Sequence, residues 1–328
     1  MADQWCKAEL GVTFLEVNFP SQVILRCSVS SNISVIIVNY NAGLELVSCV
    51  QSLAFVHDVK EIIVVDNASH DESIHQLSVH FPQKNKLTVL HNAKNLGFAV
   101  ACNQGSKIAV GDFLLYLNPD CVVTPETIPA LLQCLQNDHQ VGMGGGLILN
   151  HDGSEQRGCR RVVPTPWKSL VNSLGLQTLS RLNRRMFSDF RLDREPIPEH
   201  MVEVDAISGA CMLVSRVALA DVGPLDEGYF LHCEDLDWCM RFRQRGWKIM
   251  FVSQARLYHN KGTCSSSRPV FVEWSKHKGM VRFFRKFGAD HYPFPLSSLI
   301  WLGIWLRFGL SLVKILLKNL FGKGAKGD

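Results

Sequence analysis

The chain has 328 residues, 47% of them hydrophobic and 20% charged, and a formal net charge of +4 at pH 7. This length and composition are those of a globular protein with one large or two modest domains and a sizeable core. Lys and Arg concentrate in the last third, but the net charge is mild. A nucleic-acid-binding protein needs a concentrated basic face with aromatic residues, and we expect no nucleic-acid partner.

Eleven cysteines are scattered singly along the chain, without any CxxC pair. This spacing disfavours a zinc site, and an odd count in a chain of this size predicts free, mostly buried thiols in a reducing compartment. The first residues, MADQWCKAELGVTF, lack the basic-then-apolar layout of a signal peptide. Together these features predict a cytoplasmic protein.

Strands and helices alternate from residue 33 onward. Short, continuous apolar runs predict strands buried on both faces, and the segments between them have helical spacing. The predicted strands are 33–39, 61–65, 87–90 and 113–117, and the predicted helices are 44–53, 74–80 and 99–109. Further along, 202–214 predicts one or two more strands. The alternation predicts an α/β fold with a parallel sheet and right-handed crossovers.

Polar residues stand where the predicted strands end. Ligands of open α/β sheets collect at the carboxyl ends of the strands, so these residues are expected to share one rim of the sheet. Asx-rich strand ends are also ordinary turns, and each residue alone is a weak signal. The rim residues are Asn39, Asp66, Asn67, Asn95, Gly97, Asn118 and Asp120.

Two acids of this rim have a distinct chemical expectation. Asp66 is placed to accept a hydrogen bond from a base imide or a ribose hydroxyl. Asp120, at the tip of an Asn-Pro-Asp turn, suits a hard divalent cation such as Mg²⁺ or Mn²⁺, which would hold a diphosphate as a leaving group. The P-loop motif GxxxxGK[ST] is missing, no GxGxxG follows the first strand, and the glycines of VGMGGGL run into a strand-like segment. The sequence therefore favours a diphosphate held by a metal ion.

An acidic cluster in YFLHCEDLDWCMRFRQRGWK has two open interpretations. Glu234, Asp235 and Asp237 precede a basic segment, and acids in a first helical turn gain ~0.3–1 kcal/mol each from the helix dipole. Arg241 can also pair with Asp237 at i+4. Alternatively, the cluster is an active site in which neighbouring carboxylates raise the pKa of one acid toward a range useful for a general base.

The small residues Ser208-Gly209-Ala210 also allow two interpretations. Without bulky side chains, Gly209 either lets a sugar or an acceptor approach the backbone closely or allows tight packing of strands. The residues alone do not separate these alternatives.

The C-terminal segment 296–321 is apolar and long enough to span a membrane. Its basic residues, however, fall on one helical face and its Trp, Leu, Ile and Phe residues on the other, which predicts an amphipathic helix lying in a membrane interface. A core-packing helix is the alternative. The residues of the basic stripe are Arg307, Ser311, Lys314 and Lys318. With the basic segment 157–194, this helix indicates contact with a membrane surface that carries negative charge.

Six motifs in order resemble those of the inverting family 2 glycosyltransferases of the GT-A fold, and most of all the bacterial rhamnosyltransferase type. They are IVNYN, VVDNAS, NLGFAVACNQG, LNPD, SGACMLVSR and FLHCEDLDWCMRFRQRGW. The resemblance covers roughly 33–262 and implies a mostly parallel nucleotide-binding sheet with helices on both faces. It suggests an N-terminal extension (1–30), a nucleotide-sugar-binding half (31–150), an acceptor and catalytic half (151–265) and a C-terminal membrane-associated segment (266–328).

The resemblance also implies a role for each matching residue. Asp66, Asn95, Gly97 and Asn103 would contact the nucleotide. Asp120 is the surviving acid of the metal-binding triplet, in which Asn118 replaces an acid, and His259 would be a further metal ligand. Asp235 would be the general base, with Glu234 and Asp237 shaping the site.

The implied reaction moves a sugar, L-rhamnose from its dTDP derivative being favoured, to a lipid-linked or polysaccharide acceptor. It would take place on the cytoplasmic face of the inner membrane during cell-envelope glycan synthesis. Two other classes stay open: a non-catalytic nucleotide-sugar-binding protein, and a sugar-phosphate nucleotidyltransferase. The latter is disfavoured because no glycine-rich loop with basic residues stands near the N-terminus.

Overall fold

The computed structural model describes residues 32–54, 56–81, 86–173, 178, 190–193, 195–260 and 268–321. The chain divides into two units, 1–30 and 31–328, and the described residues all belong to the second. The predictions for the N-terminal extension, for much of the basic segment 157–194 and for the basic tail after residue 321 therefore lie outside the described residues.

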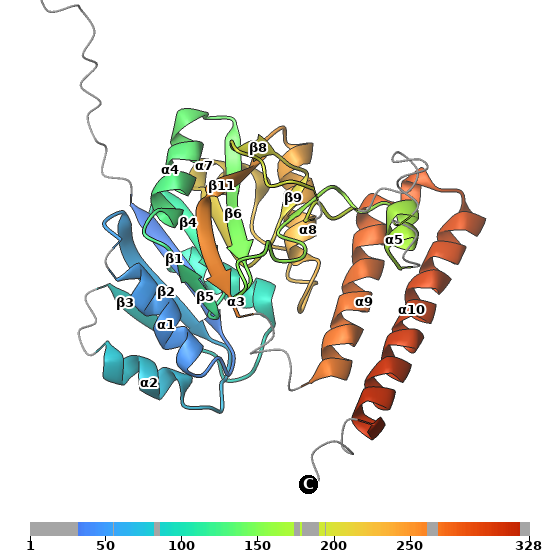
Figure 1. Ribbon diagram of the computed structural model, residues 1–328, viewed down its shortest axis with the longest axis horizontal. Helices are drawn as coiled ribbons and strands as arrows, with labels where there is room; N and C mark the ends of the chain where they lie inside the picture. The colour runs from blue at the N-terminus through green and yellow to red at the C-terminus, as the bar shows by residue number, and fades with distance from the viewer. Residues whose placement is uncertain are drawn as a thin grey trace, which may run out of the picture. The chain divides into compact units, whose positions relative to one another are not determined.

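A nine-stranded sheet forms the centre of this unit (Figure 1). The strand order is β3-β2-β1-β4-β10-β6-β11-β5, with β8 paired to β11. The strands are β1 Ile33–Asn39, β2 Val59–Asp66, β3 Leu87–His91, β4 Phe113–Leu117, β5 Cys121–Val123, β6 Val141–Leu149, β8 Val202–Glu203, β10 Cys211–Ser215 and β11 Lys248–His259. Strands β1–β4, β6 and β11 run one way, and β5, β8 and β10 run the other. The predicted mostly parallel sheet is confirmed.

The first four strands contain the predicted runs, and β1 and β4 are buried almost throughout, whereas no residue of β3 is fully buried. Every residue of β1 is buried, since β2 and β4 flank it and helices cover its two faces. The later strands are less regular. β10 enters the sheet antiparallel between β4 and β6, and a separate two-stranded sheet pairs β7 (Arg160–Arg161) with β9 (Ala206–Ile207).

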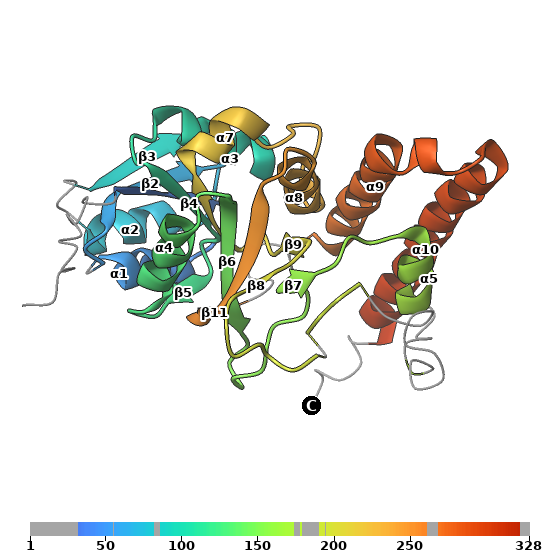
Figure 2. The same ribbon diagram turned by 90° about the horizontal axis from the view of Figure 1, so that it is seen from above.

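Helices cover both faces of the sheet, as predicted (Figure 2). Helices α1, α2 and α4 lie on one face, and α3, α7 and α8 on the other (Figures 1 and 2). The helices are α1 Leu44–Leu53, α2 Ser73–His80, α3 Phe98–Ile108, α4 Thr127–Asn137, α5 Pro166–Ser173, α7 Arg216–Val222, α8 Glu234–Gln244, α9 Pro269–Phe287 and α10 Phe294–Phe321. The fully buried Trp238 fixes α8 over the sheet, with its ring edge-on to that of Tyr116 at 5.0 Å.

The glycine run of β6 is a packing feature of the sheet. A Cβ added at Gly145 would lie 2.7 Å from Ile207 Cδ1, so only glycine lets β9 approach here. The expectation that these glycines belong to a strand and not to a phosphate loop is confirmed.

Strands from both sides of residue 150 pair within this one sheet, since β6 lies between β10 and β11. The boundaries near 150 and 265 stay predictions. All eight cysteines that the structure describes are free and buried, as expected.

Helices α9 and α10 form a hairpin that projects from the sheet-containing part (Figure 1). They pack through aromatic rings, with Trp274 5.1 Å from Trp305 and 5.5 Å from Phe308. The helix Phe294–Lys318 has a mean hydropathy of 1.8, is long and apolar enough to cross a membrane, and is not buried inside the protein. The core-packing alternative is therefore wrong.

Candidate active site

The carboxyl ends of β1 and β2 bring Asn39 and Asp66 side by side, because these residues are partners in the strand register. Asn39 Nδ2 donates to Asp66 Oδ1 at 3.0 Å. His91 Nδ1 of β3 lies 3.6 Å from Asp66 Oδ2. Asp66 is thus held in one orientation at the predicted rim, and its contact with a nucleotide stays a prediction.

Asn67 organises the loop that follows β3. Its Nδ2 donates to Asn95 Oδ1 at 3.0 Å and to Gly97 O at 3.1 Å, and its Oδ1 accepts from Leu96 N. Gly97 has a φ of +91°, and a Cβ there would lie 2.7 Å from Phe230 O. Glycine is therefore required for this loop to meet the segment that leads into α8.

Asn103 lies deeper than the rim. On α3, its Nδ2 donates to Leu225 O at 2.9 Å and to Glu227 Oε1 at 3.0 Å, and its Oδ1 accepts from Leu225 N. These bonds hold the loop before α8 against α3. The amide of Asn103 already bonds to protein atoms through both its nitrogen and its oxygen, and its contact with a nucleotide stays a prediction.

A second part of the rim joins the turn after β4 to the end of β11. Strands β5 and β11 pair antiparallel, so His259 lies near the Asn118–Asp120 turn. His259 Nε2 is 3.0 Å from Asp120 Oδ1 and 3.5 Å from Asn118 Nδ2, and the side chains of Asp120 and His259 are buried. The structure therefore brings the predicted metal ligands together.

Gln156 orients this histidine. His259 Nδ1 lies 2.7 Å from Gln156 Oε1, and with the amide oxygen as acceptor Nδ1 carries the proton. Gln156 Nε2 in turn donates to the His259 carbonyl at 3.1 Å. In the tautomer with Nδ1 protonated, the Nε2 lone pair would be available to a cation held together with Asp120, the arrangement usual for a metal-binding histidine. The sequence contains no signal for Gln156, which stands in a polar stretch 103 residues away.

Cys121 belongs to the same cluster as Asp120 and His259. Burial raises the pKa of the Cys121 thiol well above its ordinary value, and its Sγ lies 3.6 Å from the Ala210 carbonyl. In this arrangement the thiol donates to that carbonyl. The remaining donors, the Asp120 carboxylate and the His259 imidazole, fit a divalent cation such as Mg²⁺ or Mn²⁺.

Asp235 lies in the first turn of α8 beside an arginine that the sequence did not single out. Arg161 Nη2 is 2.5 Å from Asp235 Oδ2, which also accepts from Gly209 N at 3.2 Å, while Oδ1 accepts from Leu236 N at 2.8 Å. Burial by itself would raise the pKa of Asp235. The charge and hydrogen bond of Arg161, with these two N–H groups, outweigh it and lower that pKa.

The predicted effect of neighbouring carboxylates on Asp235 is therefore wrong, because it falls on Glu234 instead. Glu234 is buried, and its Oε2 has no hydrogen-bond partner among the residues the structure describes. Burial, and then the charge of Asp235, raise the pKa of Glu234 to about 8. At neutral pH the two adjacent acids are in opposite protonation states.

Asp237 faces away from Arg161. Its wholly buried carboxylate lies 2.8 Å from Arg241 Nε and 2.7 Å from Lys286 Nζ of α9, and Tyr229 OH donates to it at 3.1 Å. The predicted i+4 pair with Arg241 is confirmed. Asp237 ties α8 to α9, and a part in catalysis stays a prediction.

Gly209 and Ala210 connect the two acidic sites. A Cβ at Gly209 would lie 3.2 Å from Asp235 Cβ, so the small residue leaves room for the Asp235 side chain. The carbonyl of Ala210 accepts from Asn118 N at 2.9 Å. Two consecutive residues thus contact the candidate base on one side and the candidate metal turn on the other.

The family model of glycosyl transferase family 2 matches residues 34–197, half of the chain. The chain belongs to this family. It is a glycosyltransferase of the GT-A fold, which decides against a non-catalytic binding protein and against a nucleotidyltransferase.

Two curated relatives are similar over most of their length. The N-acetylglucosaminyl-diphospho-decaprenol L-rhamnosyltransferase of Mycobacterium tuberculosis is 27% identical over 274 residues, which are 80% of this chain and 87% of that protein. The low-salt glycan biosynthesis hexosyltransferase Agl10 of Haloferax volcanii is 26% identical over 235 residues, 70% of this chain and 67% of that protein.

Solved structures share the fold at lower identity. The mannosyltransferase PcManGT from Pyrobaculum calidifontis, in complex with GDP-Man and Mn²⁺, has a TM-score of 0.52 and 14% identity over 91% of this chain and 76% of that chain. GalNAc-T7 with UDP, GalNAc and Mn²⁺ has a TM-score of 0.52 and 21% identity over 70% of this chain, which spans only 44% of that protein. These likenesses establish the fold alone.

Proposed function

We propose that this glycosyltransferase inverts the anomeric carbon as it moves a sugar from a nucleotide diphosphate to a lipid-linked or polysaccharide acceptor. The observation that carries the proposal is the Gly209–Ala210 segment, which contacts both Asp235 and Asn118. A candidate base and a candidate diphosphate site therefore lie on opposite sides of two residues. Such an arrangement is what an in-line displacement needs.

In the proposed reaction the acceptor hydroxyl attacks the anomeric carbon while the bond to the diphosphate oxygen breaks. The bonding electron pair leaves with the nucleoside diphosphate, and the hydroxyl proton passes to Asp235. The lowered pKa of Asp235 keeps it ionised at neutral pH. Arg161 and Gly209 hold one carboxylate oxygen in place, and a base positioned in this way contributes ~10²–10⁴-fold to the rate.

Asp120 and His259 would hold the divalent cation. When bound, Mg²⁺ or Mn²⁺ would neutralise the negative charge that develops on the leaving diphosphate. Asp66, oriented by Asn39, would accept a hydrogen bond from the base or the ribose.

The favoured donor is dTDP-L-rhamnose, supported by the similarity to the mycobacterial rhamnosyltransferase. A carboxylate at Asp66 does not separate thymine from uracil, so the test compares UDP-, dTDP- and GDP-sugars with and without Mn²⁺ by thermal shift. Saturation with the true donor at 100 times its Kd should stabilise the protein by about 2.7 kcal/mol. Asp120→Asn should abolish the part that depends on Mn²⁺.

Asp138→Asn is the matched control, because Asp138 is an exposed acid paired with Lys248 away from the rim. It should keep the full Mn²⁺-dependent shift. If no nucleotide sugar stabilises the wild-type protein in either condition, donor binding at this rim is refuted.

We further propose that α10 attaches the enzyme to the cytoplasmic face of the inner membrane, where a lipid-linked acceptor for cell-envelope glycans would lie. The support is a stripe of exposed apolar residues spaced three or four apart, opposite the side that packs on α9. The stripe consists of Leu299, Leu302, Leu306, Leu310, Val313 and Leu317. The exposed face of α10 is therefore mainly apolar, whereas the sequence pattern predicted a basic face opposite an apolar one.

Liposome sedimentation tests this attachment with two matched substitutions. Leu306 of α10 is 65% exposed and Leu44 of α1 is 63% exposed. Placing an acid in the apolar layer costs about 2.5–3.5 kcal/mol, so Leu306→Asp should reduce membrane binding by about a hundredfold. Leu44→Asp should leave it unchanged, and equal binding of the two variants would rule α10 out as the anchor.

A further inference from the structure

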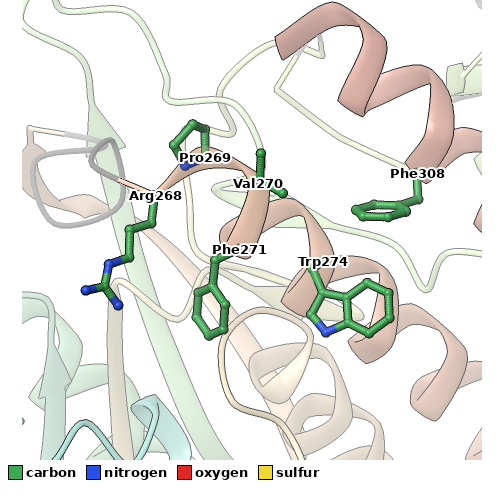
Figure 3. Close-up of a pocket in the computed structure, with 6 residues that line it drawn as sticks. All are labelled: Arg268, Pro269, Val270, Phe271, Trp274 and Phe308. Carbon is green, nitrogen blue, oxygen red and sulfur yellow. The ribbon is translucent and has the colours of Figure 1, made fainter. Parts of the chain in front are cut away.

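An apolar groove lies between the start of α9 and the middle of α10 (Figure 3). Its volume is about 580 Å³. Phe271, Trp274 and Phe308 present their rings along it, and Arg268 borders it at one end (Figure 3). The lining residues are Arg268, Pro269, Val270, Phe271, Trp274 and Phe308. The groove is therefore apolar along its length and basic at one end.

The groove continues toward the start of α8. A smaller hollow of about 140 Å³ shares Phe271 and Trp274 with it and reaches Gly228, Phe230 and Lys278. The rings of Phe230 and Phe271 meet edge to face at 5.2 Å. The apolar path thus ends on the loop that runs directly into the first turn of α8.

The turn between this loop and α8 is tightly packed against α9. His232 and Cys233 adopt the left-handed conformation, with φ of 69° and 71°, just before the carboxylates begin. A Cβ at Gly279 of α9 would lie 2.8 Å from His232 O. Because α9 touches this turn directly, a molecule seated along α9 has its far end close to the turn, which ends two residues before Asp235.

We propose that this groove binds the isoprenoid chain of a lipid-linked diphosphate acceptor and presents the sugar end of that acceptor to Asp235. The inference rests on the proposed transfer reaction and adds to it the surface that recognises the lipid. It makes the lipid chain, and not the sugar alone, a determinant of acceptor specificity.

Three observations favour a lipid chain as the occupant. Phe308 of α10 lines the groove, and α10 is long and apolar enough to cross a membrane, so the groove lies beside the helix that would meet a bilayer. Exposed cations, Arg268 at the groove and Lys278 at the hollow, stand along the path, as a diphosphate requires. Burial of apolar chain surface supplies the driving force, in proportion to the area buried.

The test introduces a charge into the groove of the full-length enzyme. Val270 is 47% exposed and lines the groove, whereas Val217 on α7 is 72% exposed and lies on the sheet-containing part. The variants Val270→Asp and Val217→Asp make the same chemical change at the two places. Each is assayed in detergent with two acceptors that carry the same N-acetylglucosaminyl diphosphate, one on a decaprenyl chain and one on a short, water-soluble chain.

A buried carboxylate cannot be solvated beside a bound hydrocarbon chain. Val270→Asp should therefore raise the KM for the decaprenyl acceptor about tenfold, a difference of about 1.4 kcal/mol. The kcat, and the KM for the short-chain acceptor, should stay at wild-type values, and Val217→Asp should change neither KM. Val270→Trp, which fills the groove with an apolar ring, should act in the same direction and covers the case in which the aspartate disturbs α9.

An unchanged KM for the decaprenyl acceptor in both Val270 variants overturns the proposal. Equal losses with both acceptors also overturn it, because they indicate a structural defect or a different occupant such as a protein segment. If the wild-type enzyme transfers sugar to neither acceptor, the proposed function itself fails. The two failures are thus distinguishable.

Discussion

The candidate active site and the α9–α10 hairpin differ in which side chains they bury and which they expose. In the candidate active site, polar side chains are buried and hydrogen-bonded to one another, as Asn39 is to Asp66 and Arg161 is to Asp235. On the hairpin, large apolar side chains such as Leu306 are exposed. Buried polar groups that bond to one another hold a fixed geometry, whereas the uncovered apolar groups of the hairpin are the basis for the proposed membrane attachment.

Helix α8 stands between these two regions and divides its acids between them. Asp235 contacts Arg161 and Gly209 on the sheet side, and Asp237 contacts Lys286 on the hairpin side. Successive helical residues are about 100° apart, so two acids separated by one residue point in nearly opposite directions. One acidic cluster therefore contains a candidate base and a structural anchor.

Asp235→Asn removes the candidate base on the sheet side of α8 and should produce the largest effect, a loss of turnover. The amide keeps the shape of the carboxylate and can still accept from Arg161, but it cannot take the acceptor proton, so kcat should fall by ~10²–10⁴-fold. Turnover with saturating donor and acceptor measures the loss, and the thermal shift with donor should persist. A kcat near that of wild type would refute Asp235 as the base.

Asp237→Asn should weaken the attachment of α8 to α9. Lys286 and Arg241 lose their shared anion, and removing one partner of a buried pair costs about 3–5 kcal/mol. Since Lys286 is 34% exposed, we expect a loss of about 2–3 kcal/mol in the free energy of unfolding, measured by denaturant titration. The folded variant should keep its kcat. A loss of kcat as large as that of Asp235→Asn would instead assign Asp237 to catalysis.

Arg161→Gln should show whether Arg161 lowers the pKa of Asp235 or only holds its carboxylate in place. Without the guanidinium, burial dominates and the pKa of Asp235 rises, so the base is ionised only at higher pH. The acidic limb of the kcat/KM profile should therefore move to higher pH. A profile that keeps its acidic limb while kcat/KM falls at every pH would show that Arg161 acts only as structural support.

Glu234→Gln should leave the contacts of Asp235 and Asp237 in place and change the pH dependence of stability. A folded pKa of about 8 lies above the unfolded value of about 4.3, so folded Glu234 holds its proton while unfolded Glu234 loses it. Its contribution therefore destabilises the folded state progressively as pH rises between these values. Relative to wild type, Glu234→Gln should be unchanged at pH 4 and become progressively more stable as the pH rises toward 8. A difference independent of pH would contradict the raised pKa.

Part of the candidate site was predicted from the sequence. Residues marked by local patterns were found, and residues that reach the site from far along the chain were missed. Asp66, Asp120 and Asp235 stand at strand ends or at a helix start, positions that local patterns reveal. Arg161 and Gln156 were missed, because they reach the site from 74 and 103 residues away along the chain. Nothing in the composition of a basic or a polar stretch shows which member folds back onto an acid.

By itself, the sequence determined the first four strands, the helices between them, the rim residues and the family, because apolar periodicity and ordered motifs are local properties. Only the tertiary structure decided which acid of Glu234, Asp235 and Asp237 is ionised beside Arg161, which is protonated and which anchors α9. It also decided that α10 packs on α9 and leaves its leucines exposed. Burial and charge at a side chain depend on neighbours that folding brings together, and a local pattern contains no record of them.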